Sequence, residues 1–251
     1  KETNEEVSMG RHGTIAGRKA AQDSKRAAMF TKYAKAITVA AKDGGDPDYN
    51  AGLRLAIEKA RAISMPNDNI QRAIKKGTGE LEGVSYEESV FEGYGPGGVA
   101  IIVDCLTDNN NRTTSFVRST FDKYGGNLGT PGCVSYMFSR KGIILIEKED
   151  SMDEDAIMEL MEVAIDAGAE DMITGDDNFE IQTDPAAYTD VHNAIVKAGY
   201  TPFESDIEYV PSMESTPKDE DLNKLKKLID ILEDNDDIQK VHNNCAIDLY
   251  E

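Results

Sequence analysis

The chain has 251 residues, of which 39% are hydrophobic and 29% are charged, and its formal net charge is −20. This composition is typical of a globular protein and excludes the disordered, fibrous and membrane-embedded classes. The longest apolar runs, such as Val99–Val103, are far shorter than the roughly 20 residues of a membrane span. The polar, acidic opening residues predict no signal peptide, and Met9 is the expected natural start after residues 1–8.

Positive charge is concentrated near the amino terminus. Residues 9–79 carry 14 Lys/Arg and 6 Asp/Glu, a net charge of +8, whereas residues 80–251 carry 12 Lys/Arg and 38 Asp/Glu, a net charge of −26. Residues 140–213 alone have a net charge of −15. This asymmetry predicts an anionic partner for the basic segment, and the acidic remainder is expected to orient the molecule on a polyanion with its basic end first.

The amino-terminal segment predicts a flexible arm followed by three short helices. Residues 10–28 are rich in Gly, Ala and basic residues and too poor in large apolar residues to bury a face, so we expect an arm that passes into a helix. Breakers at Gly44–Pro47 and at Pro66 separate the helices, which carry apolar residues at helical spacing. Asn67 or Asp68 is expected to cap the third helix.

From Val90 onward the apolar period becomes that of β-strands. Strands are expected at Val90–Tyr94, Val99–Leu106 and Cys133–Phe138, and a helix is expected after the polar cap Asn109–Thr113. The run Gly93-Tyr-Gly-Pro-Gly-Gly98, between the first two strands, matches the G-x-G-x-x-G fingerprint letter for letter. Because a strand rather than a helix follows it, the run predicts a hairpin turn and not a nucleotide site.

Residues 140–213 predict the β-α-β-β-α-β order of a ferredoxin-like unit. Its strands are expected at residues 142–147, 171–173, 179–183 and 203–210, and its helices at residues 153–167 and 188–198. In the first of these helices, the side chains expected to face inward are Ile157, Leu160, Met161, Ala164 and Ile165. A last helix at residues 222–232 and a last strand at residues 241–246 have no sheet of their own. Pairing them with the first sheet makes residues 140–213 an insertion.

We therefore expect an α+β fold with three domains. Residues 9–79 form a basic helical domain, an amino-terminal three-helix bundle with its flexible arm. Residues 80–139 and residues 214–251 together form a middle α+β domain completed by the carboxyl terminus. Residues 140–213 form an inserted, acidic, ferredoxin-like domain.

Catalytic and metal-binding patterns are missing from the sequence. The histidines, His12, His192 and His242, are scattered, and together with the separated cysteines they form no metal-binding pattern of paired ligands. Acidic runs such as Asp153–Asp155 lack the alternating ligands of a calcium loop, so we interpret them as solvated faces and turns. No G-x-S-x-G motif or phosphate-binding loop occurs. Three separated cysteines in apolar surroundings predict buried thiols in a reducing compartment. We expect a protein that is not an enzyme and that needs no metal and no cofactor.

One constellation remains, formed by the basic residues of the arm and the helices. Small residues between them let a backbone approach phosphates closely, and the basic side chains release counterions. Aromatic residues that stack unpaired bases are scarce, and large apolar residues that insert into a membrane surface are almost missing. The prediction is backbone-dominated nucleic-acid binding, against the alternative of a solvated tail. The candidate contact residues are Arg11, His12, Arg18, Lys19, Lys25, Arg26, Lys32, Lys35, Lys42, Lys75 and Lys76.

Several long motifs resemble the YebC/PmpR family, in register from Met9 to about Glu251. They are Gly17–Arg26, Phe30–Lys32, Ala51–Ala60 with Met65–Ile70, Ala73–Gly79, Glu92–Gly98, Leu106–Asn109 with Asn111–Thr113, and Gly125–Gly129. The opening departs from the family pattern. Relatives begin with M-A-G-H-S-K-W, whereas this chain keeps only His12 of that pattern and contains no tryptophan.

The resemblance implies the same three-domain layout, a cytoplasmic location, and no established catalytic residues. It also implies a DNA-binding transcriptional regulator, while the mitochondrial branch of the family resembles a translational activator. A ribosome-linked role in elongation through proline-rich stretches is the corresponding proposal for bacterial relatives. We expect a non-enzymatic nucleic-acid-binding regulator of gene expression, with DNA or ribosomal RNA as its target and no membrane partner. The alternatives are a ribosome-associated translation factor, an acidic adaptor for a basic protein partner, and a hydrolase.

Overall fold

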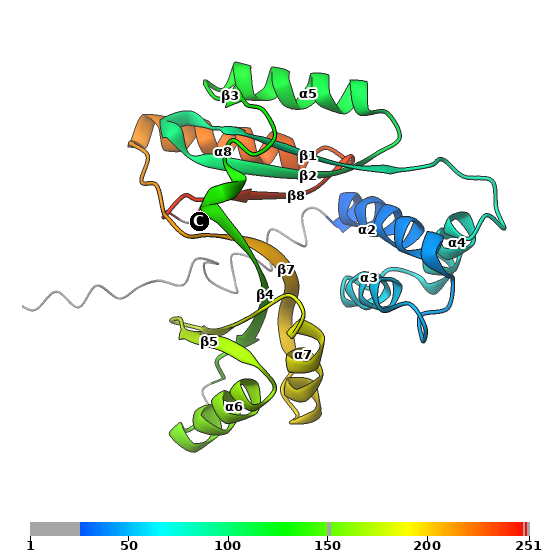
Figure 1. Ribbon diagram of the computed structural model, residues 1–251, viewed down its shortest axis with the longest axis vertical. Coiled ribbons are helices and arrows are strands. Elements are labelled where there is room, and N and C mark those ends of the chain that lie inside the picture. The colour runs from blue at the N-terminus through cyan, green and yellow to red at the C-terminus, as the bar shows by residue number, and fades with distance from the viewer. Residues whose placement is uncertain (1–25, 150–151, 248, 250–251) are drawn as a thin grey trace, which may run out of the picture. The chain divides into compact units, whose positions relative to one another are not determined.

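The computed structural model describes residues 26–149, 152–247 and 249 (Figure 1). In these ranges, helices and two four-stranded antiparallel sheets confirm the α+β class. The described residues divide into two compact units, one holding residues up to Ser135 together with Pro217–Asn243, and the other centred on Tyr136–Thr216. The helical segment and the first sheet thus share a unit, and the division into three domains stays a prediction. None of the described helices is long and apolar enough to cross a membrane.

The helical segment opens the first unit. Its elements are α2 (Arg26–Ala40), the 3₁₀ helix η1 (Ala41–Asp43), α3 (Ala51–Ala62) and α4 (Asn67–Gly77). Apolar residues at helical spacing bury a common core that includes Ile37, Leu53 and Ile70. The amide of Asn50 joins two of the helices, because its oxygen caps α3 by accepting the Leu53 N–H at 2.9 Å and its nitrogen donates to the carbonyl of Ala40 at 2.8 Å.

The cap predicted for α4 is wrong. Asn67 is already the first helical residue, and Pro66 occupies the capping position. A proline side chain has no hydrogen-bonding group, but its ring fixes φ near the value that the start of a helix needs. The Pro66 carbonyl accepts the N–H groups of Asn69 and Ile70, at 2.9 and 3.3 Å. The helix therefore starts on the backbone of Pro66 rather than on a polar side chain.

Close packing of α2 against α4 depends on Gly77. A Cβ at this position would overlap the Thr38 carbonyl and approach the Ala41 Cβ to 2.6 Å. We expect Gly77→Ala to lower the free energy of unfolding by about 1–3 kcal/mol because of this overpacking, although alanine is the better helix former. Gly52→Ala in α3 is the matched control. Its nearest neighbour would be the Asn50 Oδ1 at 3.6 Å, so we expect a gain of about 0.5–1 kcal/mol. Urea unfolding of both variants checks this, and a stabilised Gly77→Ala protein contradicts it.

The first sheet has the strand order β3-β1-β2-β8, with every neighbouring pair antiparallel. Its strands are β1 (Glu87–Tyr94), β2 (Ala100–Thr107), β3 (Asn127–Leu128) and β8 (Ile238–Asn243). Helix α5 (Asn110–Lys123) packs against β1 and β3, and α8 (Asp219–Glu233) packs against β8 and the β1–β2 turn. The glycine run is the hairpin turn that the sequence predicts, with Gly97 and Gly98 at positive φ. The last helix and strand of the chain do complete this sheet.

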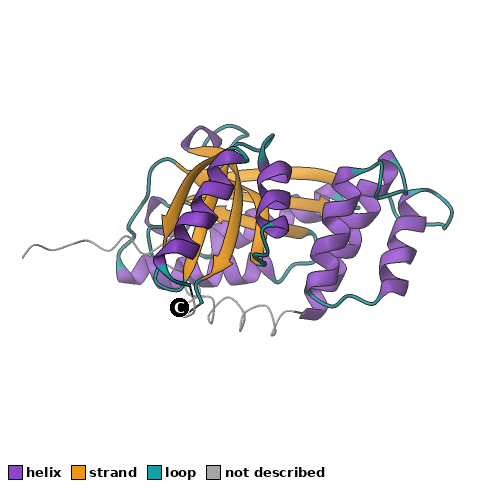
Figure 2. Cartoon of the chain, turned by 90° about the horizontal axis from the view of Figure 1, so that it is seen from below, coloured by secondary structure: helices purple, strands orange, loops and turns teal. Residues whose placement is uncertain are grey.

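The second unit has the order of elements predicted for a ferredoxin-like fold. Figure 2 distinguishes the helices and strands of the chain by colour. Its elements are β4 (Phe138–Glu147), α6 (Glu154–Asp166), β5 (Ala169–Thr174), β6 (Asn178–Thr183), α7 (Tyr188–Lys197) and β7 (Pro202–Pro211). The sheet order is β5-β6-β4-β7, so the first and third strands of the unit lie in the middle. A Cβ on Gly142 would meet the Tyr188 ring, at 2.7 Å from Cδ2, which places α7 over this face of the sheet.

The strand predicted at Cys133–Phe138 is wrong. Cys133 and Val134 lie in a turn, the 3₁₀ helix η3 (Ser135–Met137) follows, and Phe138 instead begins β4. The physical reason is the buried carboxylate of Glu92, which accepts the N–H groups of Gly132, Val134 and Ser135 at 2.8–3.0 Å. These donors are used by a side chain and are not available to a ladder of strands.

Candidate nucleic-acid interface

The structure describes about half of the basic residues that the sequence proposes as contacts. Arg11, His12, Arg18, Lys19 and Lys25 lie outside the described residues. Arg26 begins α2, and its side chain is not described. Lys32, Lys35 and Lys42 lie on α2 and η1, and Lys75 and Lys76 lie on α4.

The lysines of α2 and η1 form polar contacts with other parts of the same unit. The Nζ of Lys32 donates to the carbonyl of Glu233, at the end of α8. The Nζ of Lys42, on η1, donates to the carbonyl of Tyr86 at 2.9 Å. Lys35 is buried, with 8% of its surface exposed, so its ammonium group cannot reach a phosphate. We therefore leave Lys35 out of the interface proposed below.

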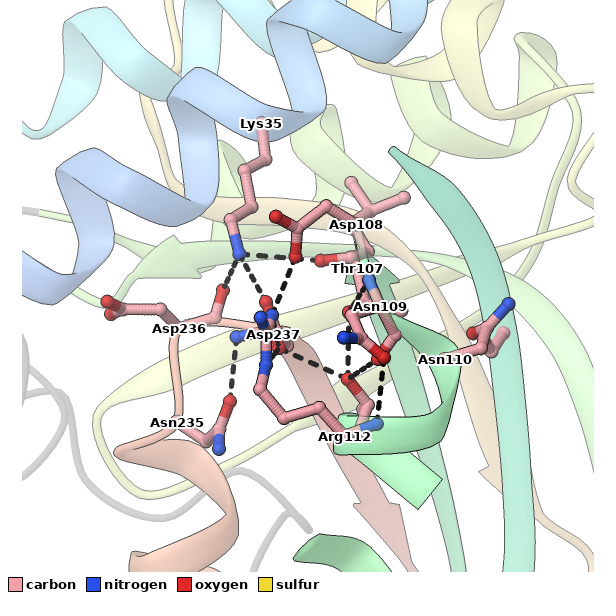
Figure 3. Close-up of polar contacts among 12 residues, drawn as sticks. Lys35, Thr107, Asp108, Asn109, Asn110, Arg112, Asn235, Asp236 and Asp237 are labelled. Carbon is pink, nitrogen blue, oxygen red and sulfur yellow. Dashed lines mark hydrogen bonds and ion pairs between the residues drawn. The ribbon is translucent and has the colours of Figure 1, made fainter. Parts of the chain in front are cut away.

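The ammonium group of Lys35 instead forms the centre of a polar network (Figure 3). It lies 2.7 Å from Oδ1 of Asp237 and 2.8 Å from the carbonyl of Asp236, both in the turn before β8. It also lies 5.3 Å from the centre of the Tyr86 ring. The side chains of Lys35 and Asp237 are only 9% and 8% exposed. A buried charge pair of this kind requires each partner to be present, because either charge alone is strongly disfavoured in the interior.

The second oxygen of Asp237 is held from the start of α5. Arg112 donates to Oδ2 through Nη2 at 2.6 Å and through Nε at 3.2 Å, and the Thr113 hydroxyl lies 3.1 Å away. Burial by itself raises the pKa of Asp237, but the hydrogen bonds from Lys35 and Arg112 and the charge of Lys35 outweigh it and hold the pKa below its ordinary value. Asn109 caps α5 by accepting the Arg112 N–H at 3.0 Å, which fixes the first turn of the helix that carries Arg112.

This network explains one of the sequence motifs. The segment Leu106-Thr-Asp-Asn109 with Asn111-Arg-Thr113 supplies the cap, the arginine and the threonine that surround Asp237. Asp237 itself was missed, because an aspartate in the run Asn235-Asp-Asp237 has the appearance of a solvated turn. The pairing of Asp237 with the buried Lys35 is what would have identified it. These two residues are far apart in the chain, so their pairing cannot be recognised in a single sequence.

A polar pocket of about 490 Å³ lies beside the network. Its lining includes Lys35, Arg112 and four acidic residues: Asp108, Asp234, Asp236 and Asp237. A general base needs a pKa close to the working pH. The carboxylate of Asp237, with its lowered pKa and two cationic partners, lacks that property. The geometry is therefore that of a structural clamp between α2, α5 and the turn before β8.

Helix α4 carries a cluster of exposed positive charge. Lys75 and Lys76 follow Arg72 by three and four residues, so each lies on the same face of the helix as Arg72, and all three are exposed. Asn69 and Gln71 are exposed on the same helix. A groove of about 330 Å³ runs beside this face, and Asn69, Arg72 and Lys76 line it together with Phe30 and Tyr86.

The other groups with metal or nucleophile chemistry do not gather into a site. Among the residues that the structure describes, no three His, Cys, Asp or Glu side chains are placed to hold a metal ion. Cys105 and Cys245 are buried, as predicted, whereas Cys133 is half-buried. Burial raises the pKa of the Cys105 thiol to about 12, so this thiol stays protonated and behaves as a small apolar side chain.

The buried carboxylate of Glu92 makes stability depend on pH. Burial by itself raises its pKa, but the three N–H donors outweigh burial and hold the pKa below its ordinary value. The stabilisation is therefore complete above the ordinary pKa and is lost as the pH falls through the lower, folded value. We expect Glu92→Gln to lower the free energy of unfolding by about 2 kcal/mol at neutral pH. Urea unfolding should show this difference shrinking as the pH falls below the ordinary pKa of a glutamate, and a pH-independent difference contradicts the role given to the carboxylate.

The described residues form a mixed α+β fold in which α4 carries a cluster of exposed basic side chains. Family models match both parts of the chain: the TACO1/YebC protein N-terminal domain matches residues 11–80, and the TACO1/YebC second and third domain matches residues 86–245. The chain belongs to the TACO1/YebC family, which confirms the resemblance.

Named relatives agree with this membership. A "probable transcriptional regulatory protein" of Clostridioides difficile is 52% identical over 242 residues, which are 96% of this chain and 100% of that protein. One from Persephonella marina is 54% identical over 233 residues, 92% of each chain. The crystal structure of a conserved hypothetical protein from Aquifex aeolicus has a TM-score of 0.80 at 43% identity and covers 94% of each chain. The relatives' names describe a regulator of transcription.

Proposed function

We propose that this protein is a nucleic-acid-binding regulator of gene expression that works in the cytoplasm and without catalysis, and that duplex DNA is its target. The observation that carries the proposal is the exposed face of α4. Arg72, Lys75 and Lys76 supply positive charge there, while Lys32, Lys35 and Lys42 are engaged with protein groups.

The side chains of α4 have the chemistry that reads duplex DNA. Lysine and arginine contact phosphate oxygens and release counterions. Arginine also recognises the edge of guanine, and asparagine and glutamine recognise adenine, when a helix enters the major groove. Asn69, Gln71 and Arg72 are exposed on α4, beside the two lysines. This combination supports α4 as the groove-facing helix of the first unit.

The amino-terminal arm adds further basic residues to the proposed nucleic-acid contact. Basic residues before α2 and at its first position add positive charge, and the small residues between them permit close approach to phosphates. They are Arg11, Arg18, Lys19, Lys25 and Arg26, with His12 as a further polar contact. The remainder of the chain, with a net charge of −26 over residues 80–251, is repelled by the same phosphates. The proposed contact is therefore confined to the amino-terminal segment.

A second candidate is a translation factor that binds ribosomal RNA. It is favoured by the aromatic lining of the α2–α4 groove, where Phe30 and Tyr86 lie beside Arg72 and Lys76. Unpaired RNA bases stack on aromatic side chains and on arginine, whereas duplex DNA offers no such base.

One experiment separates the two targets. The purified protein is tested for retention on duplex DNA and for sedimentation with ribosomes, at the same salt concentration. Retention on DNA without sedimentation supports the proposal. The opposite result replaces it with the translation factor, and capture of proteins after nuclease treatment, with neither nucleic acid bound, supports the adaptor.

A further inference from the structure

Helix α6 exposes an apolar stripe that its own unit does not bury. Leu160 and Ala164 are fully buried, as predicted. Met161 and Ile165, which the periodicity also places inward, are instead 40% and 56% exposed, and Met158 is 68% exposed. The helix therefore carries more apolar surface than its packing on the sheet uses.

The three exposed side chains form a continuous line on the helix. Met158, Met161 and Ile165 stand at positions i, i+3 and i+7, so they follow one another along two turns, about 10 Å of helix axis. Methionine is flexible and polarisable, and it is favoured on surfaces that accept apolar side chains of varied shape. Single exposed apolar residues are ordinary, whereas a stripe rimmed by charge marks an interaction surface.

The rim of this stripe is acidic. Asp155, Glu159, Glu162 and Asp166 occupy the adjoining exposed arc of α6, and Glu154 lies at its start. The helix contains no basic residue. The whole segment 140–213 has a net charge of −15. An occupant of the stripe must therefore combine apolar side chains with positive charge.

We propose that the Met158–Ile165 stripe of α6 is a docking site for a basic amphipathic helix of a partner protein. The apolar side chains of such a helix, spaced three or four residues apart, match the stripe along its length. Its lysines or arginines pair with the carboxylates beside the stripe, which adds orientation and speeds encounter.

The charge of the rim argues against other occupants. A second copy of this chain, docked through the same stripe, would bring Glu159 and Glu162 of both copies together, and like charges placed face to face are unfavourable. Phosphate backbones and anionic lipid surfaces are repelled for the same reason. The site lies on a different unit from α4, so it is independent of the proposed nucleic-acid binding.

The test uses the full chain labelled with ¹³C at the methionine methyl groups. The probe is a synthetic amphipathic helix of leucine and lysine, and the control is a peptide of the same composition in scrambled order. We expect the methyl resonances of Met158 and Met161 to shift with the amphipathic peptide, and that of Met213, exposed outside α6, to stay in place. Met158→Ser with Ile165→Ser should weaken the affinity at least about tenfold, because it removes apolar contact and leaves the charge.

Further variants and controls decide the proposal. Glu159→Gln with Glu162→Gln is expected to weaken binding of the amphipathic peptide and to reduce its dependence on salt, whereas Met213→Ser leaves binding unchanged. Equal binding of the two peptides, or unchanged binding in the double serine variant, overturns the proposal. Sedimentation equilibrium without any peptide measures self-association. If the protein self-associates and the serine substitutions abolish this, the proposal is overturned and the occupant of the stripe is a second copy of the chain.

Discussion

Asp237→Asn is expected to lower the free energy of unfolding by about 3–5 kcal/mol, the cost of leaving a buried charge without its partner. The substitution keeps the shape of the side chain but removes the negative charge that faces Lys35 at 2.7 Å. Arg112 loses the same partner. Its side chain is 53% exposed and keeps Asp108 at 2.7 Å, so the stranded lysine carries most of the cost. Urea unfolding at neutral pH measures the loss.

A double-mutant cycle separates the charge pair from the surrounding packing. Lys35→Met alone is expected to cost less than Asp237→Asn, because Asp237 retains Arg112 and Thr113. When Lys35→Met is combined with Asp237→Asn, no buried charge remains, and we expect the double variant to be more stable than Asp237→Asn alone by about 1–3 kcal/mol. If the unfolding free-energy changes of the two substitutions simply add, or if Asp237→Asn costs less than about 1 kcal/mol, the Lys35–Asp237 pair is not the structural clamp described above.

Charge reversal on α4, Arg72→Glu with Lys76→Glu, is expected to weaken binding to duplex DNA at least about tenfold and to lower the salt slope by about two, one for each phosphate contact. Both side chains are exposed, so the thermal midpoint should stay nearly unchanged. Fluorescence anisotropy with a labelled duplex measures the affinity.

The matched control places the same charge change elsewhere on the first unit. Arg118→Glu with Lys123→Glu reverses two exposed charges on α5, and we expect its affinity for DNA to stay within about twofold of the parent protein. If both pairs of substitutions weaken binding equally, the effect is one of net charge and α4 is not the contact surface. If the α4 variant binds DNA as tightly as the parent protein, the contact surface lies in the arm and not on α4.

The sequence predicts elements whose formation depends on local periodicity and misplaces those that depend on distant partners. Helices α3 and α4 and most strands of the two sheets follow from apolar spacing, whereas the short strand β3 was not predicted and β8 begins three residues before the strand predicted at residues 241–246. The pairing of β8 with the first sheet follows from the need to bury a last strand. The strand predicted at Cys133–Phe138 does not form, because the carboxylate of Glu92, more than forty residues away in the sequence, accepts the N–H groups of Val134 and Ser135.

The candidate site divides in the same way. Composition alone locates positive charge near the amino terminus, and spacing places Lys75 and Lys76 on one helix face. Residue spacing cannot distinguish the exposed Lys75 and Lys76 from the buried Lys35. The burial of Lys35 depends on the carboxylate of Asp237, 202 residues away in the sequence. Helical periodicity likewise cannot predict that Met161 and Ile165 are exposed. A wide apolar arc gives the same sequence pattern whether the helix buries it against its own sheet or leaves it for a partner.

The salt dependence of binding to duplex DNA tests the central claim most directly. If the arm and α4 together neutralise about six phosphates, the affinity of the full chain should fall roughly 10³-fold between about 50 and 200 mM salt, a slope near −5 in a plot of log affinity against log salt. A response that stays flat across this range contradicts the phosphate grip on which the proposed function rests.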